Sequence, residues 1–175
     1  MATIYISGSM TTVTVILLYT VLAAAAFTDI YKKTIPLAVD IILLAIGVLS
    51  IWTVPGISVA EHLIGAACIS VPMILIDLAV HEAFGGGDIK FMAAAGFFLG
   101  WKAAIVAFCI AVLSGGVYAA VMLVTRRKKK KDHFAFAPFL CVGIAIAAFK
   151  GYGTYWFDSI IFMIKTVFTA MQRGV

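Results

Sequence analysis

The sequence predicts an all-α, polytopic membrane helix bundle, and two observations support that prediction. Of the 175 residues, 64% are hydrophobic and only 12% are charged, whereas soluble domains are about 45–50% apolar and about 25% charged. The hydrophobic residues also gather in long runs separated by short polar stretches, which is the pattern of membrane-spanning helices. The length fits one membrane-embedded domain over residues 1–175.

About six hydrophobic segments follow one another along the chain. Pro55-Gly56 closes the second, and the basic run Arg126–Lys131 separates the fifth from the sixth. A seventh candidate, residues 156–171, contains Asp158 and Lys165 and is the weakest, because charged residues are costly within a membrane. The six expected segments are residues 13–27, 37–54, 62–80, 89–100, 103–124 and 134–149.

The fourth segment is too short to cross a membrane as a straight helix. Twelve residues, 89–100, would rise about 18 Å, against a hydrocarbon core of about 30 Å. We expect either a half-helix buried within the bundle or a helix that continues through Trp101 with a kink. The small residues from Ala93 to Gly96 would permit close helix contacts in both cases.

Basic residues near the segment ends predict the orientation in the membrane. If the segments alternate in direction, most of these residues fall on one face, which is then cytoplasmic, and the N-terminus lies outside. The cytoplasmic set is Lys32, Lys33, Lys90 and Arg126–Lys131, and only Lys102 and Lys150 fall opposite. We therefore interpret the basic run as a topology determinant in contact with anionic lipid, and the net charge of +5 does not imply nucleic acid.

Two aspartates lie at the ends of odd-numbered segments and hence on the same face. Asp29 ends the first segment, and Asp88 stands in a Gly-x-Gly-Asp element at the start of the fourth. Ionisable residues at membrane segments indicate function by default. Two carboxylates and one water can hydrolyse a peptide, because one ionised carboxylate accepts a proton from water while the other, protonated, donates to the carbonyl oxygen. The pair predicts an intramembrane aspartyl protease.

The glycines before Asp88 fit this chemistry. Gly85, Gly86 and Gly87 could let an extended substrate approach closely and could adopt positive φ. Metal chemistry is not expected, since the cysteines form no CxxC pair and the histidines have no ligand spacing. No cofactor is expected either. The cysteines are Cys68, Cys109 and Cys141, all within apolar segments where packing is the usual role, and the histidines are His62, His81 and His133.

Structural explanations exist for the same residues. Asp88 could be an ordinary N-cap after a glycine turn, Asp29 a juxtamembrane acid, and Lys90 a snorkelling lysine or a carboxylate partner. Structural or pore-lining roles are favoured for three other acids near membrane depth, which are Asp40, Asp77 and Asp158. A proton- or cation-coupled transporter or channel component is an alternative function, although the two halves show no repeat. A structural subunit of a secretion complex is a third.

In order along the chain, the motifs resemble the type IV prepilin peptidases over about residues 13–150. The resemblance rests on an aspartate seven residues before the Pro of an Ile-Pro pair, which is Asp29 with Pro36. It continues with the GxGDxK element that contains Asp88 and Lys90, and with the late element Phe136–Phe139, which contains Pro138. Leu37 stands where the family often has Asn, and Ala135 and Ala137 replace the usual Pro and Gly.

The resemblance implies catalysis by Asp29 and Asp88, with Gly85, Gly86, Gly87, Lys90, Pro36 and Pro138 in substrate-binding or supporting roles. It also implies removal of the leader from prepilins or pseudopilins at the cytoplasmic face of the bacterial cytoplasmic membrane. Association with pilus or secretion machinery is a further implication. About a dozen residues precede the first segment and no CxxC is present, so we expect a peptidase-only member without the N-terminal methyltransferase domain.

Overall fold

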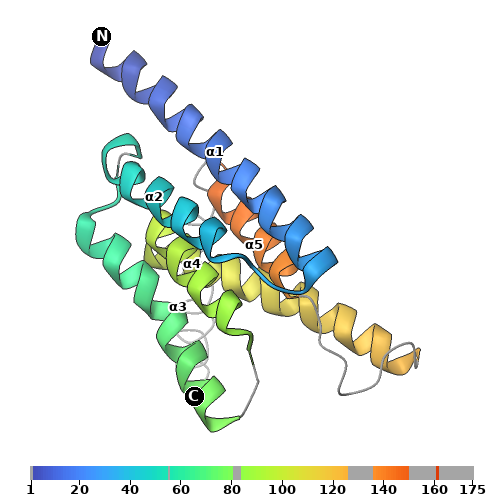
Figure 1. The fold of residues 1–175 in the computed structure, drawn as a ribbon. Helices are drawn as coiled ribbons and strands as arrows, with labels where there is room; N and C mark the ends of the chain where they lie inside the picture. The colour runs from blue at the N-terminus through green and yellow to red at the C-terminus, as the bar shows by residue number, and fades with distance from the viewer. Residues whose placement is uncertain (1, 55, 81–83, 126–135, 150–160, 162–175) are drawn as a thin grey trace, which may run out of the picture.

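Five helices, and no strands, make up the part of the chain that the computed structural model describes, which is residues 2–54, 56–80, 84–125, 136–149 and 161 (Figure 1). Three helices contain stretches long and apolar enough to cross a membrane, which are Thr12–Lys32, Val59–Ala79 and Gly86–Met122. The prediction of an all-α membrane bundle is confirmed. The helices are α1 (Ala2–Lys32), α2 (Leu37–Thr53), α3 (Val59–Ala79), α4 (Gly86–Val124) and α5 (Ala137–Ala148).

Helix α4 reverses direction at Gly100, where the backbone leaves helical geometry with φ 74° and ψ 165°. Phe84, just before α4, contacts Phe136 with ring centroids 6.2 Å apart and ring planes tilted by 50°, and Gly115 lies beside the same Phe136. A straight helix would carry residues 31 positions apart roughly 45 Å from each other. The first arm of α4 (residues 86–99) and the second arm (residues 101–124) therefore run antiparallel, as Figure 1 shows.

The two arms correspond to the fourth and fifth expected segments, so the described residues contain six helical segments. The first arm forms the most buried part of the bundle, and its helix continues into a reversal at Gly100 rather than a mild kink. Six of its apolar side chains are almost completely buried, which are Phe91, Met92, Ala94, Ala95, Phe98 and Leu99. The seventh candidate, residues 156–171, falls almost entirely outside the described residues, as do Arg126–Lys131, Lys150, His81 and His133.

Glycines and alanines bring the helix backbones into close contact around α4. A Cβ atom at Gly65 of α3 would collide with the carbonyl oxygen of Gly96, and a Cβ at Gly96 would collide with that of Gly65. On the second arm of α4, the carbonyl oxygen of Ala107 would collide with a Cβ at Gly143 of α5. Small residues at helix crossings are the usual basis of tight packing in membranes, where van der Waals contact drives association.

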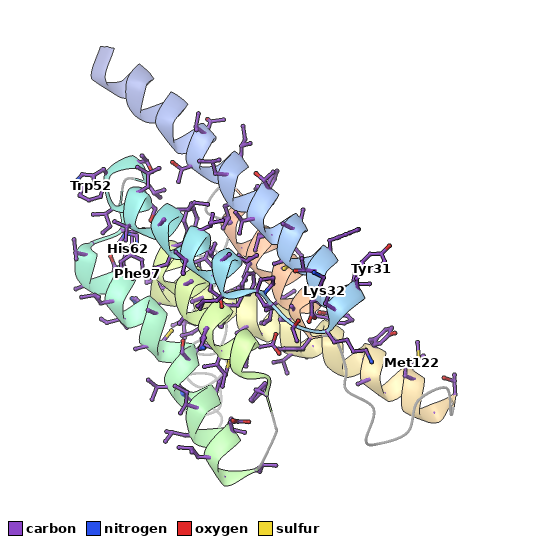
Figure 2. The ribbon with its side chains drawn as sticks, in the orientation of Figure 1. Tyr31, Lys32, Trp52, His62, Phe97 and Met122 are labelled. Carbon is purple, nitrogen blue, oxygen red and sulfur yellow. The ribbon has the colours of Figure 1, made fainter. Side chains whose placement is uncertain are left out.

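Polar side chains stabilise the end of the bundle at which α4 reverses, which we call the hairpin end. The Nδ1 of His62 donates to the carbonyl of Phe97, 2.5 Å away, three residues before the reversal at Gly100. Figure 2 shows both side chains near Trp52 and far from Tyr31 and Lys32 at the opposite end. Ser58 and Glu61 form a capping box at the start of α3.

Candidate active site

Asp29 lies in the last turn of α1, where it is only 5% exposed. Its Oδ2 accepts a hydrogen bond from the backbone N–H of Ala137 at 3.1 Å, across 108 residues of sequence. Ala137 is the first residue of α5, so Asp29 caps this helix from outside and interacts favourably with its positive dipole end. The sequence placed Asp29 just after the first segment, but α1 continues to Lys32 and holds the carboxylate on a rigid helix.

Asp88 occupies the first turn of α4. The helix begins at Gly86, so the N-cap explanation for Asp88 is wrong, since an N-cap precedes the first helical residue. The carboxylate instead turns back and accepts a hydrogen bond from the backbone N–H of Gly85. It is partly exposed, unlike Asp29, and it lies within electrostatic range of both Asp29 and Asp40.

Asp40 brings a third carboxylate to this end of the molecule. It stands in the first turn of α2, is 7% exposed, and its buried Oδ1 has no hydrogen-bond partner among the described residues. Lys90, which is exposed on the first arm of α4, lies within electrostatic range of Asp40. The sequence favoured a structural or pore-lining role for Asp40, and the structure puts it in the same group as Asp29 and Asp88.

We call the end of the bundle that holds Asp29, Asp40 and Asp88 the aspartate end. Each of these three carboxylates lies at the N-terminus of a helix. Asp29 caps α5, Asp40 is in the first turn of α2, and Asp88 is in the first turn of α4. Unpaired backbone N–H groups and the positive ends of helix dipoles favour negative charge at such positions. The arrangement lets three acids gather at the edge of an apolar bundle, where isolated charges would be costly.

The glycines and prolines predicted to support the site surround these acids. Gly87 lies against Ile35, so the turn before α2 touches the start of α4. Pro36 ends that turn with φ −65° and ψ 138°, and Pro138 is the second residue of α5. The expectation of positive φ at Gly85, Gly86 and Gly87 is wrong, because among the described glycines only Gly56 and Gly100 adopt it. Open space surrounds Gly86, where an added Cβ would meet nothing within 4 Å.

Other ionisable residues do not join the dyad. The Oδ1 of Asp77 accepts from the backbone N–H of Phe84 at 3.2 Å, which fixes the segment leading into α4. His62 lies at the hairpin end, and Asp158 falls outside the described residues. Cys141 of α5 is buried within electrostatic range of Asp29 and Asp88. Within the described residues, no group of three or more His, Cys, Asp or Glu residues could hold a metal ion.

Sequence reasoning missed the partner of Asp29. The donor is the backbone N–H of Ala137, and the alanine side chain gives no chemical sign of this role. The only sequence signal for a helix start at this point is Pro138, the next residue. The late element Phe136–Phe139 was the available hint. In the fold, this element begins α5 against Asp29. Ala137 is fully buried and is the first residue of that helix.

Comparison with known proteins gives a consistent result. Residues 16–120 match the model of the type IV leader peptidase family. A "Prepilin leader peptidase/N-methyltransferase" of Bacillus subtilis (strain 168) is 36% identical over 145 residues, which cover 82% of this chain and 56% of that protein. Proteins of the same name are 28% identical over 156 residues in Aeromonas salmonicida (strain A449), covering 86% of this chain and 54% of the relative, and 35% identical over 77 residues in Legionella pneumophila, covering 44% and 25%.

The chain thus spans about half the length of the first two of these relatives, and a quarter of the third. No solved structure matches it.

Proposed function

Since the chain belongs to the type IV leader peptidase family, we propose that it is a membrane aspartyl endopeptidase that removes leader peptides from prepilins or pseudopilins. The observation that supports this most directly is the approach of Asp29 and Asp88, which come from α1 and α4 and interact electrostatically at one end of the bundle. Two carboxylates that share a site do not both ionise easily, so the pair holds one proton between them. That is the protonation state that carboxylate-activated hydrolysis requires.

The proposed reaction proceeds in two steps. The ionised carboxylate takes a proton from water as the water oxygen bonds to the scissile carbonyl carbon, and the protonated carboxyl donates its proton to the carbonyl oxygen. The resulting diol then collapses, the C–N bond breaks, and the leaving amine receives the proton that the first carboxylate had accepted. The diol returns the other proton, so the dyad ends as it began.

Backbone groups of the protein would position this dyad. The N–H of Ala137 holds Asp29, and the N–H of Gly85 holds Asp88. The open space at Gly86 leaves room for an extended peptide beside the dyad. The large apolar side chains exposed on α1, α2 and α3 would face lipid, and a hydrophobic substrate helix could lie there beside the bundle.

We further propose that the dyad faces the cytoplasm. The orientation follows from the basic residues near Asp29 and Asp88, of which Lys32, Lys33 and Lys90 are exposed at this end. Prepilins and the machinery that assembles them would be the partners.

The test compares isosteric variants on one prepilin co-expressed with the enzyme. We expect Asp29→Asn and Asp88→Asn each to lower cleavage by about 10²–10⁴-fold or more, because an amide can neither accept nor donate the required proton. Asn at position 29 still accepts from the Ala137 N–H, so folding should be retained. Asp77→Asn is the matched control, since it keeps an oxygen for the Phe84 N–H and should cleave normally. Substantial cleavage by either dyad variant would sink the proposal.

A further inference from the structure

Two phenylalanines contact each other where two helices begin at the aspartate end. The rings of Phe84 and Phe136 have centroids 6.2 Å apart and planes tilted by 50°. Both side chains are half-buried and pack against the core of the bundle. Tilted aromatic pairs at about 4.5–7 Å attract each other more strongly than their buried area alone would predict. The pair thus joins two segments that are far apart in the sequence.

Phe136 is attached to the backbone group that holds Asp29. It is the N-cap residue of α5, and its carbonyl accepts from the N–H groups of Phe139 and Leu140 at 3.0 and 3.2 Å. The next residue is Ala137, whose N–H donates to Oδ2 of Asp29 at 3.1 Å. Because one peptide bond joins Phe136 to this donor, a displacement of Phe136 also displaces the group that holds Asp29.

Phe84 stands in the same relation to Asp88. Gly85, the next residue, directly precedes α4, and its carbonyl accepts from the N–H of Ile89 at 3.2 Å. The Asp88 carboxylate lies over this glycine, since an added Cβ on Gly85 would be 3.1 Å from Oδ2 of Asp88. One peptide bond therefore joins Phe84 to the residue against which the Asp88 carboxylate rests.

The separation of the two carboxylates consequently depends on how α5 is placed against the start of α4. The bond from Ala137 fixes Asp29 to α5, and the contact with Gly85 fixes Asp88 to α4. A displacement of about 1 Å in a reacting group can lower a rate by about 10²-fold. A contact that holds these two helix N-termini together would therefore affect the reaction without touching the substrate.

We propose that Phe84 and Phe136 are positioning residues, whose ring contact holds the N-termini of α4 and α5 together and so sets the separation of Asp88 and Asp29. This inference rests on the proposed peptidase function and deepens it. Each ring acts through the helix N-terminus to which it is attached, and the chemistry stays with the two carboxylates.

A second aromatic contact between the same helices provides a matched control. Tyr118 of the second arm lies against Phe139 of α5, with ring centroids 5.4 Å apart and planes tilted by 45°. This pair also joins α4 to α5, but neither of its residues adjoins Ala137 or Gly85. If aromatic contacts served only to stabilise the bundle, loss of either pair would have the same consequences for cleavage.

Cleavage kinetics of the purified full chain on one prepilin give the first arm of the test. Leucine keeps apolar bulk without a ring, so in Phe84→Leu and Phe136→Leu we expect kcat to fall by about 10–100-fold while KM changes by less than about twofold. The double variant should lose no more than the worse single variant, because the two residues act through one contact. Phe84→Tyr keeps the ring and should keep most of kcat. Tyr118→Leu should keep kcat.

Three kinetic results would overturn the inference. A raised KM with unchanged kcat in Phe84→Leu or Phe136→Leu would mean that the rings contact the substrate instead. Losses that multiply in the double variant would mean that the two residues act separately. A loss of kcat in Tyr118→Leu as large as that in Phe84→Leu would mean that any aromatic contact between α4 and α5 has the same effect.

Hydrogen exchange at the Ala137 amide is a second arm that needs no substrate. Phe136–Ala137 is one of two Phe–Ala pairs in the sequence, so carbonyl-labelled phenylalanine with amide-labelled alanine gives two magnetic resonance signals. The signal that disappears in Phe136→Leu belongs to Ala137. In lipid nanodiscs, Phe84→Leu should speed exchange of this amide by about 10-fold, because α5 is held less firmly and the bond to Asp29 opens more often.

Tyr118→Leu should leave the exchange rate of the Ala137 amide unchanged. An unchanged rate in Phe84→Leu, or equal acceleration in both variants, would overturn the inference. Because this arm measures the bond to Asp29 directly, a protein that failed to cleave prepilin would refute the proposed function while the role of the aromatic pair was still decided.

Discussion

The two ends of the bundle differ in whether they bring like charges together. At the hairpin end, Ser58 pairs with Glu61 and the Nδ1 of His62 pairs with the Phe97 carbonyl, while the buried Nε2 of His62 has no hydrogen-bond partner among the described residues. At the aspartate end, like charges are brought together and the buried Oδ1 of Asp40 has no partner. Paired polar groups stabilise a fold, whereas clustered carboxylates and orphan acceptors destabilise it. We therefore interpret the hairpin end as the part that holds the helices in register, and the aspartate end as the part that carries the proposed catalytic groups.

This contrast predicts that substitutions at the two ends will change stability with opposite sign. Disruption at the hairpin end should lower resistance to unfolding and leave the activity of each folded molecule intact. Neutralisation at the aspartate end should change activity and raise or preserve resistance to unfolding. Such a trade between stability and activity is common where an active site stores unfavourable interactions.

The largest expected effect on stability is at the crossing of α3 and the first arm. Gly65→Val places side-chain atoms against the Gly96 carbonyl and the Gly100 backbone, which cannot retreat because they belong to a packed helix. We expect loss of about 3 kcal/mol or more, measured as unfolding in mixed detergent and SDS by circular dichroism. Gly116→Val is the matched control, since an added Cβ there meets nothing within 4 Å. Equal stability of the two variants would contradict the close approach of these helices.

Asp40→Leu should change stability in the opposite direction. Leucine continues the apolar row of α2 and removes a buried carboxylate with an unpartnered oxygen. Replacement of buried charged groups by hydrophobic residues of similar size often stabilises by about 1–4 kcal/mol. The same unfolding assay measures the change, and Asp77→Leu is the control, because it deletes the acceptor of the Phe84 N–H and should destabilise. A destabilised Asp40→Leu would mean that Asp40 is a structural group like those of the hairpin end.

The smallest effect concerns the hydrogen bond that closes the reversal. His62→Leu removes the donor to the Phe97 carbonyl and should cost about 1–3 kcal/mol, the usual penalty for a buried acceptor left without a partner. His62→Asn can retain a donor at the Nδ1 position and removes Nε2, which is buried without a partner. It should therefore recover part of the loss. If both variants unfold at the same denaturant concentration, the His62–Phe97 bond contributes nothing measurable.

Much of the fold could be predicted from the sequence because apolar runs report membrane segments directly. The six segments, and the gathering of Asp29 and Asp88 at one end, follow from counting alternating crossings. The sharp reversal at Gly100 could not be predicted, since a glycine in an apolar helix gives no sign of whether its φ will be positive. Without this reversal, the two arms of α4 would not return the chain to Phe136.

The acids of the candidate site could be predicted from the sequence, but the groups that bond to them could not. Asp29 and Asp88 are unusual residues in an apolar sequence, so composition alone drew attention to them. The bond from Ala137 to Asp29 depends on packing between segments 108 residues apart and involves a backbone group that every residue has. Asp40 was visible as an acid, but its burial and its interaction with Asp88 depend on the register of α2 against α4.

The bond from Ala137 to Asp29 has a consequence for biosynthesis. During translation, α1 emerges from the ribosome long before α5, so Asp29 waits without its donor while α2, α3 and both arms of α4 enter the membrane. If Asp29 and Asp88 act as proposed, the nascent chain would acquire the hydrogen bond that positions Asp29 only when α5 has formed. A chain truncated before α5 would then keep both aspartates and lack the donor that positions Asp29, so we expect such a chain to cleave poorly.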